Sequence, residues 1–219
     1  MVNSVKRSIP GLALATLLLF AGTAQAQQSA KPGTFDYFVL SMSWSPQYCA
    51  NGGDQKSPAQ CGPQRRYGFV LHGLWAQHTK DGWPQYCAPA TPVPAAIVDK
   101  MLAITPSKSL IQHEWDKHGT CSHLSVDEYF DDAAKAFAAV TVPEPYKNPE
   151  KFITTSIPDM TSAFTAVNPG LDPSEIALYC KGPYLAEVRI CLGKDFKPAN
   201  CGSDLHNRCG KTIVVRPLK

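Results

Sequence analysis

The chain has 219 residues, with 21 basic and 18 acidic side chains. Two of the basic side chains, Lys6 and Arg7, lie near the start, and without them 19 basic residues face 18 acidic ones, a net charge of +1. So small a charge excludes a broad basic surface that binds nucleic acids without specificity. Any affinity for anions must therefore come from a local cluster of residues.

A secretory signal peptide is predicted at residues 1–26. The two basic side chains are followed by an apolar run at residues 11–23 and by a small-x-small cleavage site at residues 24–26. Removal of this leader would leave residues 27–219 as one domain, exported to a periplasm or to the extracellular medium. The apolar run is too short for a comfortable membrane span, and no later stretch is long or apolar enough, so we expect no contact with a membrane.

All eight cysteines follow the predicted leader. An even count in an exported chain favours four disulfides, and the lack of any Cys-x-x-Cys pair makes metal-bound or reactive thiols the weaker interpretation. The sequence alone leaves about 105 pairings open. Two pairs are the easiest to close locally, because each spans a short loop with Gly or Pro: Cys49 with Cys61, and Cys191 with Cys201.

Two strands are predicted in the first third of the chain. Residues 35–42 are rich in aromatic and apolar side chains and predict a buried strand, which a loop at residues 50–64 follows. Residues 67–75 predict a second strand, with His72 at its end, directly before Gly73. Such a histidine can present its imidazole at the rim of a sheet, but a core histidine bonded to the backbone is the more common case.

A loop and a helix are predicted next. Residues 76–92 form the loop, which carries Trp83 and Tyr86. Their rings could stack on a nucleic-acid base, although filling the core is the commoner role of such side chains. Residues 93–104 then show helical spacing of apolar side chains, with a proline that is tolerable in a first turn.

The most informative stretch is residues 110–118, where two histidines, two carboxylates and a lysine surround one tryptophan. If the stretch is helical, Glu114 and His118 are four residues apart and share a face. His113 and Lys117 form a second such pair, turned by about 100°. A carboxylate and imidazole row would then lie beside a cationic row, as a site that handles an anionic substrate by proton transfer requires.

A zinc site and an ordinary amphipathic helix are the alternatives for this stretch. The zinc-protease motif places two histidines four residues apart, with a glutamate between them. Here His113 and His118 are five apart, so their side chains diverge by roughly 140°, and no third ligand follows at a suitable spacing. A helix with solvated charges would be the default for any one of these residues, but five polar groups around a tryptophan argue against it.

The rest of the chain completes the prediction of an α+β fold. Ser125 and Glu128 form a capping box that opens a helix to about residue 139, and a shorter helix is expected at about residues 159–167. Strands at both ends of the chain, with helices between them and no linker, predict a single disulfide-stapled domain with a central antiparallel sheet flanked by helices. Three strands near the C-terminus are predicted at residues 176–180, 185–192 and 212–215.

A resemblance to a known family rests on the histidine-bearing segments. Two segments resemble the active-site segments of the ribonuclease T2 family: His72-Gly73-Leu74-Trp75 and His113-Glu114-Trp115-Asp116-Lys117-His118-Gly119-Thr120-Cys121. Residues 38–49 resemble the opening strand of that family in its bacterial form, and the cysteine-rich last third fits as well. The resemblance covers nearly all of the chain after the leader.

This resemblance implies an endoribonuclease that needs no metal and no other cofactor. Such an enzyme cleaves single-stranded RNA by transesterification to a 2′,3′-cyclic phosphate, which is then slowly hydrolysed. Because the reaction uses the 2′-hydroxyl, RNA and not DNA would be the substrate. We expect the chain to act as a monomer. The alternative is a non-catalytic, disulfide-rich binding protein on the same fold.

The roles of the two histidines carry over by position from the family. His118 matches the general base that takes the 2′-OH proton, and His72 matches the general acid that protonates the leaving 5′-oxygen. An imidazole pair can do both tasks, because an unperturbed histidine titrates near pH 6.5. One ring must be neutral and the other charged, so a bell-shaped pH profile is expected. The two rings can exchange roles between the two steps, which leaves the assignment of the base open.

The other site residues carry over in the same way. Glu114 and Lys117 match the pair that stabilises the pentacovalent phosphorane, His113 matches the phosphate-binding histidine, and Trp75 matches an aromatic that stacks on a base. The proline that usually follows this tryptophan is Ala76 here. Residues that could complete the base site, without a clear match in the family, are Gln77, Trp83 and Tyr86. The disulfides that the resemblance implies are Cys87–Cys121, Cys180–Cys209 and Cys191–Cys201, beside the local pair Cys49–Cys61.

Overall fold

The computed structural model describes residue 1, residues 30–53 and residues 57–218. The predicted signal peptide, apart from Met1, lies outside the described residues. Within the described ranges no helix has both the length and the apolar character that a membrane crossing needs.

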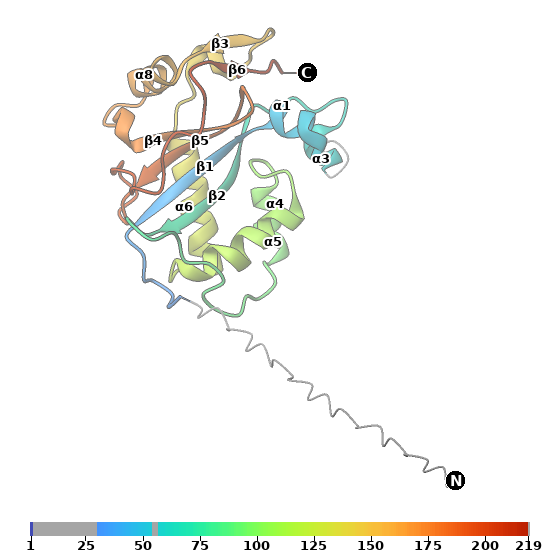
Figure 1. Cartoon of the computed structure of the whole chain (residues 1–219), viewed down its shortest axis with the longest axis vertical. Coiled ribbons are helices and arrows are strands. Elements are labelled where there is room, and N and C mark those ends of the chain that lie inside the picture. Colours follow the sequence, from blue (N-terminus) through green and yellow to red (C-terminus); the bar gives the residue numbers. More distant parts are fainter. Residues whose placement is uncertain (2–29, 54–56, 219) are drawn as a thin grey trace.

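One open sheet of six strands forms the centre of the fold (Figure 1). Its strands run in the order β2, β1, β5, β6, β3, and β4 pairs with β5 beside this path. All pairings are antiparallel except the contact of β5 with β6, so the expected antiparallel sheet has one parallel pair. The strands are β1 (Tyr37–Trp44), β2 (Phe69–Gln77), β3 (Ile153–Thr155), β4 (Ile176–Lys181), β5 (Tyr184–Leu192) and β6 (Ile213–Val215).

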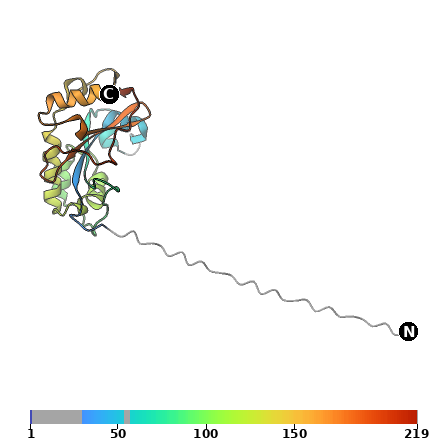
Figure 2. The same ribbon diagram turned by 60° about the vertical axis from the view of Figure 1, so that its left-hand side comes forward.

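Helices lie on one face of the sheet and along its β2 edge (Figures 1 and 2). The longer ones are α4 (Ala95–Met101), α5 (Lys108–Lys117), α6 (Val126–Ala139) and α8 (Ile157–Val167). The predicted α+β class and its principal strands and helices are therefore confirmed. The predicted loop at residues 50–64 is wrong in part, because it holds a π turn (Cys49–Gly53) and the short helix α3 (Pro58–Cys61). Two further short helices, α1 (Ser45–Tyr48) and α7 (Glu144–Lys147), and strand β3 were not predicted. Each of the short helices α1, α3 and α7 has a proline in its first turn, where a proline removes no helical hydrogen bond.

The main hydrophobic core lies between the sheet and helix α6. Leu40 and Met42 of β1 pack with Tyr129 and Phe130 of α6, and all four are buried. The Tyr129 hydroxyl also donates a hydrogen bond of 2.9 Å to the carbonyl oxygen of Leu74, which ties α6 to β2. Helix α6 begins at the predicted capping box, in which the side chains of residues 125 and 128 each bond the other's backbone nitrogen.

A β-bulge in β2 decides which residues leave the core. Ser41 of β1 pairs with Gly73 and Met42 pairs with Leu71, so His72 has no partner on β1. The extra residue shifts the alternation of the strand by one position. Leu71 and Leu74, three residues apart, therefore both face the main core. The prediction that His72 ends the strand was wrong, because β2 continues past it to residue 77.

Four disulfides join the elements, and they pair the cysteines as the local loop (Cys49–Cys61) and the family resemblance (Cys87–Cys121, Cys180–Cys209 and Cys191–Cys201) predict. The second links the loop after β2 to the turn that follows α5, and its cysteines are 34 residues apart. The fourth closes only 10 residues at the end of β5. In the chain-entropy account, a longer closed loop restricts the unfolded chain more and stabilises the fold more.

Removal of the Cys87–Cys121 crosslink as the double alanine variant should lower the free energy of unfolding by about 3.5 to 4 kcal/mol. Removal of Cys191–Cys201 is the matched comparison, because both crosslinks have a fully buried cysteine, and it should cost about 1 kcal/mol less. Urea unfolding of both variants measures the difference. A larger loss for the Cys191–Cys201 variant would contradict the loop-length account.

Candidate active site

A cavity of about 290 Å³ lies between the outer face of the sheet and helix α5. All six residues for which the sequence predicts catalytic or substrate-binding roles line it: His72, Trp75, His113, Glu114, Lys117 and His118. Two of them come from β2, three from α5, and His118 caps the C-terminal end of α5. The structure therefore brings together two segments that are separated by about forty residues of chain.

Helix α5 presents its polar residues to the cavity because its apolar residues anchor the other side. Ile111 and Trp115, one turn apart, are buried in the main core. The helix ends at His118, and the chain then turns at Gly119 towards the Cys87–Cys121 disulfide. A side chain at Gly119 would overlap the Trp115 ring, so this tight turn requires glycine.

Glu114 and Trp75 connect the two segments. The indole nitrogen of Trp75 donates a buried hydrogen bond of 2.7 Å to Oε2 of Glu114. The carboxylate passes so close to β2 that a Cβ atom at Gly73 would overlap it. Glu114 is 3% exposed, and this burial raises its pKa, while the charge of His72 and the bond from Trp75 act in the opposite direction.

His118 lies in an apolar and cationic environment. Its ring stacks on Trp75 with a centroid distance of 5.3 Å, and its Nδ1 atom is buried with no hydrogen-bond partner among the described residues. Burial, and then the positive charge of Lys117, lower the pKa of His118 to about 3. The ring is therefore neutral at mildly acidic and neutral pH and can accept a proton.

His72 lies in the opposite environment. Its Nδ1 atom is 2.8 Å from Oε1 of Glu187 on β5, and its Nε2 atom is 3.8 Å from Oε1 of Glu114. Burial lowers the pKa of His72, but the hydrogen bond and charge of Glu187 and the charge of Glu114 outweigh it, so the pKa is raised above 6.5. Between about pH 3 and pH 6.5 this ring is therefore charged while that of His118 is neutral, and it can donate a proton.

His113 and Lys117 line the cavity from the cationic row of α5. His113 is exposed, and it also lines an adjoining hollow of about 410 Å³ that shares His72 with the cavity. Partial burial, and then the charge of Lys117, lower the pKa of His113. Among the described residues, no group of three or more histidine, cysteine or carboxylate side chains has the arrangement that a metal ion would need.

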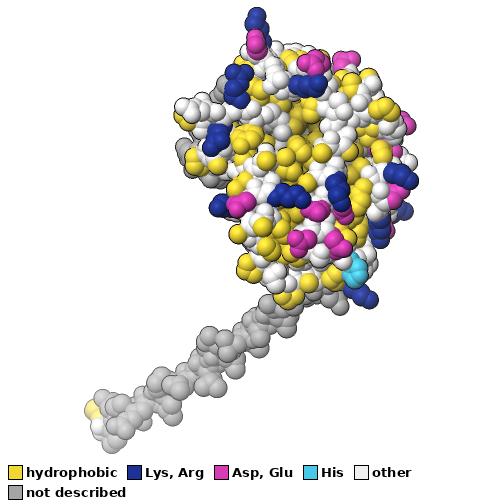
Figure 3. All heavy atoms as spheres, turned by 180° about the vertical axis from the view of Figure 1, so that it is seen from behind, with side chains coloured by type: hydrophobic (Ala, Val, Ile, Leu, Met, Phe, Trp, Pro, Cys, Tyr) yellow, Lys and Arg dark blue, Asp and Glu magenta, His cyan; other side chains and the backbone are white. Residues whose placement is uncertain are grey.

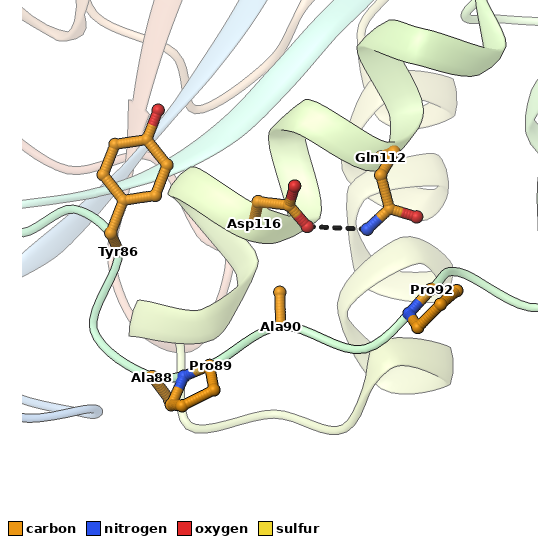
Figure 4. A pocket seen from close by; sticks show the side chains of 7 residues that line it. All are labelled: Tyr86, Ala88, Pro89, Ala90, Pro92, Gln112 and Asp116. Atoms are coloured by element: carbon orange, nitrogen blue, oxygen red, sulfur yellow. Dashed lines mark hydrogen bonds between the residues drawn. The ribbon is translucent and has the colours of Figure 1, made fainter.

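A larger hollow lies elsewhere on α5 (Figure 4). It measures about 620 Å³, and alanine and proline side chains of residues 88–92 form much of its wall. The Gln112 amide donates a bond of 2.6 Å to Asp116, and its oxygen accepts one from the backbone of Val93. This pair therefore holds the loop against α5, and the hollow contains none of the histidines.

Glu187 and Arg189 were missed by the sequence analysis. Both lie on β5, and Arg189 bonds the Glu187 carboxylate through Nε at 2.8 Å and Nη2 at 2.6 Å. The sequence held one signal, because two charges at alternate positions of an otherwise apolar strand must share one face. Nothing in the sequence indicated that this face meets His72, since the two residues are 115 positions apart.

The comparisons with known proteins agree with this geometry. The model of the ribonuclease T2 family matches residues 35–201, and the chain belongs to this family. A "Probable ribonuclease" of Haemophilus influenzae is 38% identical over 128 residues, which cover 53% of this chain and 47% of that protein. A "Ribonuclease" of Aeromonas hydrophila is 41% identical over 110 residues, 50% of this chain and 47% of that protein. The chain thus spans about half the length of these two relatives.

A solved structure shares the fold. RNase NT, in complex with 5′-AMP, superposes with a TM-score of 0.67 over 84% of this chain and 98% of its own, at 23% identity.

Substitution of Gly73 by alanine should force apart the contact between β2 and the Glu114 carboxylate. We expect the free energy of unfolding to fall by about 1–3 kcal/mol, as in other overpacked sites. Urea unfolding measures the change, and Gly210→Ala is the matched control because a Cβ there would meet nothing within 4 Å. Equal stability of the two variants would show that α5 can move away from β2 at no cost.

Proposed function

We propose that this protein is an endoribonuclease that cleaves single-stranded RNA by transesterification through a 2′,3′-cyclic phosphate. The observation that carries the proposal is the pair His72 and His118, which line one cavity in opposite electrostatic environments. Membership of the ribonuclease T2 family and the two bacterial relatives support it. The non-catalytic alternative requires a lost histidine, and both are present.

The first step needs one proton acceptor and one proton donor. His118, neutral, takes the proton of the 2′-hydroxyl, and the 2′-oxygen attacks the phosphorus. As the bond between phosphorus and the 5′-oxygen breaks, His72 gives its proton to that oxygen. In the second step the roles reverse: His72 takes a proton from water, whose oxygen opens the cyclic phosphate, and His118 returns its proton to the 2′-oxygen.

Residues of α5 are proposed to stabilise the negative charge that develops on the phosphorane. Lys117 carries a positive charge one helical turn from His113, and both line the cavity. Glu114, held by the indole of Trp75, lies close to the Nε2 atom of His72, where the leaving oxygen would be protonated. We propose that Glu114 and Lys117 stabilise the phosphorane and that His113 binds the phosphate.

Aromatic side chains are proposed to bind the base. Trp75 is 9% exposed, and its ring already contacts His118 and the guanidinium of Arg189, which leaves it little free area. Trp83 lines the same cavity and is 52% exposed, so it offers the larger free surface for stacking, with Gln77 beside the cavity as a hydrogen-bonding group. Tyr86 lines the separate 620 Å³ hollow of Figure 4 and is not part of this site.

The remaining proposals concern partners and location. The surface in Figure 3 mixes basic and acidic side chains, in keeping with a protein that binds RNA at one local site. We propose that RNA and not DNA is cut, that no metal is needed, and that the enzyme is monomeric. We also propose that residues 1–26 are removed on export to a periplasm or the medium, and that residues 27–219 form the catalytic domain.

Digestion of single-stranded RNA in excess EDTA, with products analysed by mass, tests the reaction. We expect 2′,3′-cyclic phosphate ends from the wild type, and a loss of about 10²-fold to 10⁴-fold for His118→Ala, because the general base is removed. His78→Ala is the control, since this histidine lies outside the cavity. Cleavage that disappears in EDTA would support a zinc enzyme using His113, Glu114 and His118, and no cleavage at all would support the binding protein.

The pH dependence of kcat/KM for a dinucleotide substrate should be bell-shaped. Activity should rise as His118 loses its proton near pH 3, and fall above pH 6.5 as His72 loses its proton, by about tenfold per pH unit on the alkaline side. Tryptophan fluorescence over the same range identifies any acid unfolding. An alkaline limb that begins well below pH 6.5 would contradict the assignment of His72 as the acid.

A further inference from the structure

We infer that Glu187 is the positioning residue of His72, the partner that fixes the tautomer and orientation of its imidazole and stabilises its charge. This inference rests on the proposed function, and it names the residue through which the general acid is prepared. Glu187 lines the adjoining 410 Å³ hollow with His72 and His113, but it does not line the 290 Å³ cavity, so its contact with a substrate in that cavity runs through His72.

The contacts of the Glu187 carboxylate are divided between its two oxygens. Oε1 is 2.8 Å from Nδ1 of His72. Oε2 accepts bonds from Arg189 and, at 3.2 Å, from the hydroxyl of Ser41, while the Ser43 hydroxyl reaches Oε1 at 3.5 Å. The side chain is only 12% exposed, and a carboxylate so buried is stable as an anion only when it is paired and hydrogen-bonded. All four partners satisfy that requirement.

The tautomer of His72 follows from these contacts. An ionised carboxylate can only accept hydrogen bonds, so the Nδ1 atom of His72 must carry the hydrogen. Nε2 is then the nitrogen that gains and loses a proton, and it points towards Glu114 and the cavity. A carboxylate that holds an imidazole in this way is a known means of orienting a catalytic histidine and stabilising its charged form.

His118 shows what a histidine of this site is like without such a partner. Its Nδ1 atom is buried and has no hydrogen-bond partner among residues 30–53 and 57–218. Both rings contact Trp75: the His118 ring stacks on the indole, and the His72 ring meets it edge-on. Glu187 therefore contributes to the asymmetry of the pair, because it is the carboxylate that hydrogen-bonds one ring and not the other.

Arg189 holds Glu187 in place. Its guanidinium lies 4.8 Å from the ring centre of Tyr179 and 4.9 Å from that of Trp75, so its position is fixed by two aromatic rings. Burial raises the pKa of Glu187, but the bond to His72, the charge of His72 and the Arg189 guanidinium outweigh it and lower the pKa to about 2. The carboxylate therefore stays ionised wherever His72 is charged.

Other charges also reach His72, and their signs matter for the test. Glu187 and Glu114 favour its charged form, whereas Arg189 opposes it. The cationic side of the cavity is contributed by α5 and its cap, and β1 contributes only hydroxyl groups towards Glu187. On that side lie Lys117, His113 and the neutral His118, and the C-terminal part of the chain adds Asp204, His206 and Arg208 to the cavity lining.

The test is a titration of His72 by ¹⁵N NMR in the full-length mature protein, which needs no activity. In the wild type, Nδ1 should retain its hydrogen after the ring is neutralised. In Glu187→Gln the amide keeps the size of the side chain but loses the charge, so the midpoint should fall by about 1 to 3 pH units. The alkaline limb of kcat/KM should move down by the same amount, a change that a merely structural defect would not produce.

Two further variants keep the result decisive. Glu187→Asp keeps the negative charge, so the midpoint of His72 in this variant should lie above that in Glu187→Gln. Glu150→Gln changes the net charge equally at an exposed position and should leave the midpoint unchanged. If Glu187→Gln does not fold, the tautomer of His72 in the wild type decides. A midpoint of His72 that is insensitive to Glu187, or an Nε2–H tautomer, would overturn the inference. A shifted midpoint in a protein that cuts no RNA would leave the contact intact and refute the proposed function instead.

Discussion

The indole of Trp75 donates a buried hydrogen bond to the Glu114 carboxylate, and through this bond strand β2 and helix α5 keep a fixed separation. The bond is possible only because Gly73 lets the carboxylate approach the strand backbone. Both histidines contact the same indole: His118 stacks on it, and His72 lies edge-on to it. Helix α5 is in turn anchored by Ile111 and Trp115 in the core, so the rigidity of the interior reaches the cavity.

The two histidines of this cavity differ in their surroundings and not in their intrinsic chemistry. His118 is buried beside cations, which disfavours a second positive charge. His72 meets carboxylates on both ring nitrogens, which favours one. We propose that the site obtains one acid and one base from two groups of the same kind because carboxylates lie beside only one of them.

The sequence predicted the local parts of this design better than the long-range ones. The helical period placed Glu114 and His118 on one face of α5, and the capping box at Ser125 placed the start of α6, because both depend on neighbours within a few residues. The bulge at His72 depends on how β2 pairs with β1, and the role of Glu187 depends on a contact across 115 positions. Neither leaves a signal in a single sequence, since pairing register is set by the whole sheet.

The bulge also determines which residues of strand β2 face the main core and which face the cavity. Before the bulge, Leu71 lies in the main core. After the bulge, Leu74 faces the core and Trp75 faces the cavity. Substitutions at residues 72, 73 and 75 therefore change the site, and those at 71 and 74 change the packing. The core-facing residues of this strand can therefore be substituted without a change in the residues that face the cavity. Deletion of one residue at the bulge, in contrast, would turn core-facing residues towards the cavity and cavity-facing residues towards the core.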